Sequence, residues 1–199
     1  MLLFILGSVI PYGFFIAFHF KEYGAIYIKD DHYLSLLGSI GSIGNGLFRM
    51  ILGVTMDVIS FRKLMIGNLI VFMITCGTVT FSVQNKITYL ITIVLSYGCY
   101  GSLYSIFPTQ TVRILGKSIG SKMYYITFLG FSFGAIVQYA FHRILVEKYQ
   151  ADGYTYCFII FGALVVVGFV LVLTIDFQMH EDEKRLLNQR NYRTVETTI

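Results

Sequence analysis

The chain consists of long apolar runs that alternate with short segments holding most of its charge. An apolar run of about 20 residues is long enough to cross the hydrocarbon core of a bilayer as an α-helix. No run shows the strict alternation of apolar and polar residues that a membrane β-strand requires. The pattern therefore predicts an all-α membrane protein with six transmembrane helices. These helices are expected over residues 2–20, 33–56, 64–83, 87–107, 123–141 and 154–175.

The composition and the charge agree with a protein that lies in a bilayer. Hydrophobic residues make up 56% of the chain and charged residues only 13%, whereas soluble domains carry about 25% charged residues. The net charge of +4 is spread between the apolar runs. It forms no basic patch for nucleic acid, so we expect no nucleic-acid partner. The partner that the composition predicts is the lipid bilayer.

The reactive side chains predict neither an enzyme nor a cofactor. The cysteines are odd in number and lie inside apolar runs, which favours free buried thiols over disulfides. The histidines lie at span ends or in connections, and no His–Glu or Cys–His spacing is typical of a metal site. No order of Ser, His and Asp is typical of a hydrolase. The residues concerned are Cys76, Cys99, Cys157, His19, His32, His142 and His180.

The distribution of Lys and Arg predicts the orientation of the bundle, because cytoplasmic connections are enriched in both. Nine of them lie in the second and fourth connections and in the C-terminal segment, against five in the other connections, where five acidic residues offset them. Both termini are therefore predicted on the cytoplasmic side. We expect residues 1–178 to form the bundle and residues 179–199 to form a disordered cytoplasmic tail. The first run has no preceding Lys or Arg and is too long for a signal peptide.

The predicted helix over residues 33–56 carries one charged residue, Arg49, within its apolar sequence. A charge at the centre of a bilayer costs at least ~2.5–3.5 kcal/mol, so this side chain is expected to face protein or water. Polar and small residues recur around it at spacings of three and four, which places them on one helix face. Small residues on such a face let a neighbouring helix approach closely. The face consists of Gly38, Gly41, Ser42, Asn45, Arg49, Gly53 and Met56.

Two interpretations of Arg49 remain open from these residues. In the structural one, Arg49 reaches the cytoplasmic headgroups or pairs within the bundle, for which Asp57 lies two turns away. In the functional one, Arg49 binds an anionic substrate, because its planar guanidinium meets a carboxylate through two charge-assisted hydrogen bonds. Tyr97 and Tyr104 of the fourth span offer hydroxyls to the same carboxylate. The alternative for both tyrosines is packing between helices.

The segment GVTMDVISFRK resembles the loop signature of the major facilitator superfamily, Gly-x-x-x-Asp-Arg-x-Gly-Arg-Arg/Lys. The match holds at Gly53, Asp57 and the basic pair Arg62 and Lys63, and two other positions differ. In that family the loop joins the second and third helices of each six-helix half. The resemblance implies that the acid docks on a neighbouring helix end and that the basic groups bind across the bundle.

A longer match resembles one group within that superfamily. NGLFRMILG over residues 45–53 is similar to the eighth helix of the oxalate/formate antiporter group and its monocarboxylate-transporter relatives. FPT over residues 107–109, with the glycines that follow, is similar to the junction of the tenth and eleventh helices. The resemblance covers nearly the whole chain and aligns its spans with helices seven to twelve. It implies that Arg49 binds the carboxylate of a small organic anion, with Asn45 beside it.

Two positions depart from the pattern of these relatives. In monocarboxylate transporters the residue four before the arginine is typically an acid that takes part in proton coupling, and here it is Asn45. In the oxalate antiporter the eleventh helix carries a lysine for the second carboxylate, whereas residues 124–141 contain no Lys or Arg. The residues for proton coupling and for dicarboxylate specificity are therefore missing at these positions.

Six helices form only one half of such a transporter, whose substrate lies between two rocking six-helix bundles. The resemblance therefore implies a second half as partner, from the same gene product, another chain or a second copy. The predicted function is alternating-access transport of a monocarboxylate or dicarboxylate. The alternative is a membrane subunit or fragment that keeps the fold for protein–protein interaction and does not transport.

The predicted topology is tested with glycosylation-acceptor tags. A tag between residues 143 and 152 is expected to be modified, because this connection faces away from the cytoplasm when both termini are cytoplasmic. A tag at the C-terminus is expected to stay unmodified. Gel mobility with and without glycosidase reports both, and the reverse pattern would contradict the orientation.

Overall fold

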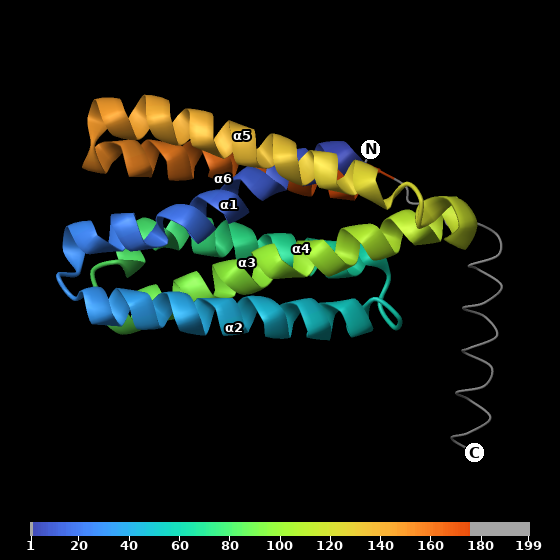
Figure 1. Cartoon of the computed structure of the whole chain (residues 1–199), viewed down its shortest axis with the longest axis horizontal. Coiled ribbons are helices and arrows are strands. Elements are labelled where there is room, and N and C mark those ends of the chain that lie inside the picture. The colour runs from blue at the N-terminus through green and yellow to red at the C-terminus, as the bar shows by residue number, and fades with distance from the viewer. Residues whose placement is uncertain (1, 176–199) are drawn as a thin grey trace, which may run out of the picture.

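The computed structural model describes residues 2–175, which form six α-helices and no strand (Figure 1). All six are long and apolar enough to cross a membrane, which confirms the predicted fold class and number of spans. The predicted tail over residues 179–199 lies outside the described residues. The helices are α1 (Leu2–Tyr27), α2 (Asp31–Thr55), α3 (Phe61–Ser82), α4 (Lys86–Gly120), α5 (Tyr124–Tyr149) and α6 (Ala151–Thr174).

The largest difference from the prediction is the length of α4. Residues 108–122 were expected to form a connection, but the helix continues through Pro108 to Gly116, where φ is 77° and the helical path breaks. A proline inside a helix removes the backbone hydrogen bond to the carbonyl four residues before it, which here is the carbonyl of Tyr104, and membrane helices tolerate this loss. The hydroxyls of Thr109 and Thr111 donate to the carbonyls of Ser105 and Phe107 at 2.7 and 2.9 Å.

Three of the four other connections are also shorter than predicted, and the connection between α3 and α4 keeps its predicted length. α1 continues to Tyr27 instead of ending near residue 20, and only Gln150, with φ of 50°, separates α5 from α6. In the α1–α2 connection, the Asp30 carboxylate caps α2 by accepting the Tyr33 N–H at 3.0 Å. The same carboxylate contacts the Lys86 ammonium, and this hydrogen bond lowers the pKa of Asp30 below its usual value.

The six helices pack as two related groups of three. α5 and α6 lie on one side of the bundle and α2 on the other, with α1, α3 and α4 between them (Figure 1). The most extensive contacts join α2 to α4 and α1 to α5. If α1, α2 and α3 are matched in order to α4, α5 and α6, the α2–α4 pair corresponds to the α5–α1 pair. The α3–α4 contact corresponds in the same way to the α6–α1 contact. Inverted repeats of this kind are a common construction of membrane transporters.

The start of α1 and the end of α6 lie at the same end of the bundle as the α2–α3 and α4–α5 connections (Figure 1). The three remaining connections lie at the opposite end. This arrangement agrees with the predicted grouping of the connections. Which of the two ends faces the cytoplasm stays a prediction.

The core is largely apolar and aromatic, and several of its buried hydroxyls bond one another or the helix backbone. Tyr12 is fully buried, and its hydroxyl lies 3.3 Å from that of Ser96 and 3.5 Å from that of Thr75. The three cysteines are buried free thiols, as predicted. Buried hydroxyls therefore connect α1, α3 and α4 without any charged group.

Part of the predicted small-residue face of α2 packs against α4, through Gly41, Asn45 and Gly53, whereas Ser42 and Arg49 of that face are exposed. A Cβ atom on Gly101 would lie 2.6 Å from the backbone oxygen and the side-chain Cγ of Asn45, and one on Gly98 would lie 2.6 Å from the Phe48 ring. On α2 itself, Gly41 lies against the Tyr97 ring. The missing side chains let the two helices approach closely. This approach holds Asn45 directly against α4.

Gly101→Ala is expected to destabilise the bundle, because its methyl group would overlap the Asn45 backbone, and overpacking of this kind costs about 1–3 kcal/mol. Thermal unfolding in detergent measures the loss. Gly67→Ala is the control, since nothing lies within 4 Å of the added methyl group. Equal melting temperatures for both variants would contradict the close α2–α4 packing.

Candidate functional site

The site forms around Arg49, which is exposed near the C-terminal end of α2. Its guanidinium donates a hydrogen bond to the Asn45 side-chain oxygen at 3.2 Å. The guanidinium carbon lies 4.6 Å from the centre of the Tyr104 ring on α4, a cation–π contact. Two side chains from two helices therefore fix the position of the charge.

Asn45 is held in the orientation that this contact needs. Its side-chain N–H donates to the Tyr97 carbonyl of α4 at 3.0 Å, so the amide oxygen is left to face Arg49. The Ser105 hydroxyl donates to the Arg49 carbonyl at 2.9 Å. Two hydrogen bonds thus join α2 to α4 close to Arg49, one from the Asn45 side chain and one to the Arg49 backbone.

Tyr104 contacts two other aromatic side chains, Phe131 and Tyr100. It stacks on Phe131 of α5, with ring centres 4.1 Å apart and planes 23° apart, and Phe131 is buried. Its hydroxyl lies 2.6 Å from the hydroxyl of Tyr100, which is buried between α1 and α4. One of these hydroxyls donates to the other, so the accepting hydroxyl keeps its own proton for a further partner.

This arrangement suits an anion. None of the ion pairs among the described residues includes Arg49. A guanidinium has five N–H donors in a planar fork, and the contact to Asn45 uses one of its nitrogens. The remaining donors can form two parallel hydrogen bonds with a carboxylate. A tyrosine hydroxyl within the same group can supply one more.

Of the four substrate-site residues predicted from the sequence, three come together: Arg49, Asn45 and Tyr104. Tyr97 contributes its backbone carbonyl, whereas its buried side chain points to α1 and its hydroxyl donates to the Ala17 carbonyl at 2.9 Å. Its hydroxyl therefore has a packing role. The stacking of Phe131 under Tyr104 was not predicted, because it joins helices that periodicity alone does not pair.

The loop residues form contacts at the end of the bundle where α2 meets α3. The Asp57 carboxylate accepts a hydrogen bond at 3.1 Å from the largely buried guanidinium of Arg113 on α4. Asp57 pairs with Arg113, so the suggested pairing of Arg49 with Asp57 was wrong. The extra turns of α4 beyond Pro108 make the Asp57–Arg113 pairing possible. The other structural interpretation, in which Arg49 reaches the cytoplasmic headgroups, stays a prediction.

The remaining motif residues differ in their contacts. Arg62 at the start of α3 donates to the Leu173 carbonyl in the last turn of α6, so one basic group does reach across the bundle. Lys63 is exposed, and a Cβ atom added to Gly53 would lie 3.5 Å from the Ser105 side chain, an ordinary contact distance. The Arg62 contact ties the ends of two helices together and takes no part in the site at Arg49.

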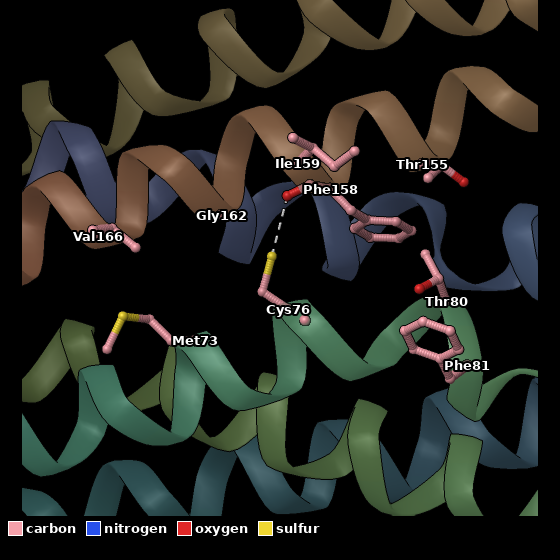
Figure 2. A pocket seen from close by; sticks show the side chains of 10 residues that line it. Met73, Cys76, Thr80, Phe81, Thr155, Phe158, Ile159, Gly162 and Val166 are labelled. Atoms are coloured by element: carbon pink, nitrogen blue, oxygen red, sulfur yellow. Dashed lines mark hydrogen bonds between the residues drawn. The ribbon is translucent and has the colours of Figure 1, made fainter.

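Two cavities lie away from Arg49 and are apolar. One of about 400 Å³ lies between α3 and α6, where Cys76 contacts the Phe158 carbonyl and Gly162 leaves space (Figure 2). The other, of about 510 Å³, is lined by residues of α1, α5 and α6, among them Phe4 and Phe133. Neither is lined by a charged side chain, so neither suits an anion.

Comparison with protein families finds a match that spans almost the whole chain. The family described as Major Facilitator Superfamily matches residues 1–197. Among the curated proteins, no sequence matches the chain. The family match agrees with the six membrane-spanning helices.

Asp57→Asn is expected to lower the melting temperature without changing the site at Arg49. The substitution removes the negative partner of the largely buried Arg113, and a hydrogen bond to a charged group contributes about 1.5–3 kcal/mol. Thermal unfolding measures the effect, with the exposed Lys63→Gln as a control. An unchanged melting temperature in Asp57→Asn would show that the pair contributes nothing to stability.

Proposed function

Because the chain belongs to the Major Facilitator Superfamily, we propose that it acts as one half of a secondary transporter for small organic anions. Its six helices supply one bundle, and a second six-helix half completes the pathway. Transport then follows from the rocking of the two bundles around a site near the middle of the membrane. Monocarboxylates or dicarboxylates are the proposed substrates.

The observation that carries this proposal is the guanidinium of Arg49 held in place by neutral partners. Asn45 and Tyr104 position it without neutralising its charge. A charge that is kept unpaired in an apolar helix requires water or an anionic ligand to offset its cost. A carboxylate offers two acceptor oxygens at the spacing of the guanidinium fork.

The exposed position of the site supports a partner bundle. Arg49 lies on the outer surface of this chain, and a charged side chain in a membrane helix cannot face lipid without large cost. A second half placed against α2 and α4 would cover the guanidinium and form the other side of a substrate cavity. The partner is the same gene product, another chain or a second copy.

The carboxylate role is tested by thermal unfolding of the purified protein, with any copurifying partner, across a series of carboxylates. The wild type is expected to be stabilised by its substrate. Arg49→Lys keeps the charge but loses the two-pronged geometry, and the loss of one charge-assisted hydrogen bond weakens binding about tenfold or more. Arg49→Gln is expected to abolish the stabilisation.

The matched control is Arg143→Gln, which removes an exposed arginine that pairs with Glu147 on α5. It is expected to keep the full carboxylate effect. The binding role fails if both Arg49 variants lower the melting temperature without ligand while any carboxylate effect remains. Transport itself is measured as carboxylate flux into vesicles that contain the reconstituted complex. Absence of flux would favour the alternative, a non-transporting subunit that keeps the fold.

A further inference from the structure

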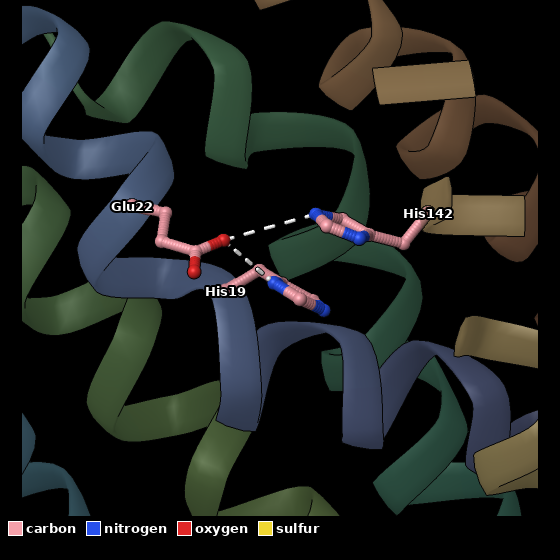
Figure 3. A group of neighbouring side chains, drawn as sticks. All are labelled: His19, Glu22 and His142. Carbon is pink, nitrogen blue, oxygen red and sulfur yellow. Dashed lines mark hydrogen bonds and ion pairs between the residues drawn. The ribbon is translucent and has the colours of Figure 1, made fainter. Parts of the chain in front are cut away.

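Figure 3 shows a second polar cluster between α1 and α5. Its residues lie toward the ends of these helices that face the α1–α2 and α5–α6 connections. It consists of His19 and Glu22 on α1 and His142 on α5. The first two are three residues apart, so they share one face of the helix. The spacing rules applied to the sequence missed this cluster, because His142 reaches it only through helix packing.

The distances in the cluster suit a shared metal ion. A ring nitrogen of His19 lies 2.8 Å from a Glu22 carboxylate oxygen, and a ring nitrogen of His142 lies 3.7 Å from the same oxygen. Zinc with tetrahedral bonds of about 2.0–2.1 Å separates its ligand atoms by about 3.3 Å, between these two values. One ligand atom from each of the three residues lies within 4.8 Å of the others.

The ligand types also fit such an ion. Two imidazoles and one carboxylate are a common set for zinc and related transition metals. His19 and Glu22, three residues apart on α1, lie on one helix face and so can bind the same ion. His142 adds a buried ring nitrogen, Nε2, which has no hydrogen-bond partner among the described residues.

Neighbouring side chains support the cluster from outside. The Tyr154 hydroxyl of α6 donates to the same Glu22 oxygen at 3.2 Å, and the Phe15 ring packs near both imidazoles. A hydrogen bond to a ligating carboxylate orients it and raises metal affinity. Three helices therefore hold the cluster in place.

The two imidazoles are stacked, with ring centres 3.7 Å apart and planes 10° apart. The lone pair of each ring nitrogen lies in its ring plane, so parallel rings cannot both point at one ion. Binding must turn at least one ring out of the stack. This rotation is a change that a spectroscopic probe can detect.

We propose that His19, Glu22 and His142 bind a divalent transition-metal ion of the zinc class and so fasten the end of α1 to α5. This metal site shares no residue with the anion site at Arg49, so the proposal is independent of the proposed transport of anions. Water completes the coordination of the ion.

Zinc titration of the metal-stripped full-length protein without a histidine tag tests the proposal by calorimetry. The wild type is expected to bind one Zn²⁺. His19→Gln, Glu22→Gln and His142→Gln are each expected to weaken binding at least about 100-fold, more than the loss of an outer hydrogen bond. Tyr154→Phe, which loses only that outer hydrogen bond, is expected to weaken binding about tenfold. His32→Gln is the matched control, since this exposed histidine lies outside the cluster, and it should bind like the wild type.

A structural role without metal would move only the melting temperature, so Co²⁺ supplies a second readout. Its visible absorption reports the ligand set, and the wild type is expected to show the bands of a mixed nitrogen and oxygen site. If a ligand variant does not fold, the zinc affinity of Tyr154→Phe and the Co²⁺ spectrum of the wild type test the proposal instead. Absence of zinc binding in the wild type, or equal affinity in the ligand variants and His32→Gln, overturns the proposal.

Discussion

The close approach of α2 to α4 is the constraint on which the arrangement around Arg49 depends. Gly101 has no side chain, and only for that reason can Asn45 lie against α4 and bond the Tyr97 carbonyl. With the amide fixed in this way, its oxygen faces the guanidinium of Arg49. The same approach places the Tyr104 ring against the Arg49 guanidinium. Backbone packing between two helices thus determines the electrostatics of the site.

The magnitudes show why Arg49 is tolerated in an apolar helix. A charge costs at least ~2.5–3.5 kcal/mol at the bilayer centre, and the cost for Arg49 is smaller because it lies near the end of α2. A hydrogen bond to a charged group contributes about 1.5–3 kcal/mol, and a cation–π contact about 0.5–2 kcal/mol. The contacts to Asn45 and Tyr104 therefore offset much of the cost, but they leave the positive charge in place. A neutralising acid at the same position would offset it too and would remove the attraction for an anion.

The sequence predicted the number of spans, part of the packing face of α2 and the pairing of Arg49 with Asn45, because each follows from local periodicity. It misplaced the end of α4, because a membrane helix tolerates Pro108 and continues beyond it, and the added turns carry Arg113, which pairs with Asp57. It did not predict the Phe131 stack or the group of His19, Glu22 and His142. Both join helices far apart in the chain, and their geometry depends on which helices pack together.

The central claim is that a carboxylate binds directly to the Arg49 guanidinium, and solid-state NMR in lipid bilayers tests it most directly. The protein carries ¹⁵N-labelled arginine, and the monocarboxylate carries ¹³C in its carboxyl group. A dipolar coupling between the two nuclei is expected in the wild type and in Arg143→Gln, and it should vanish in Arg49→Gln. A coupling that persists in Arg49→Gln, or its absence from the wild type at saturating ligand, would contradict the account.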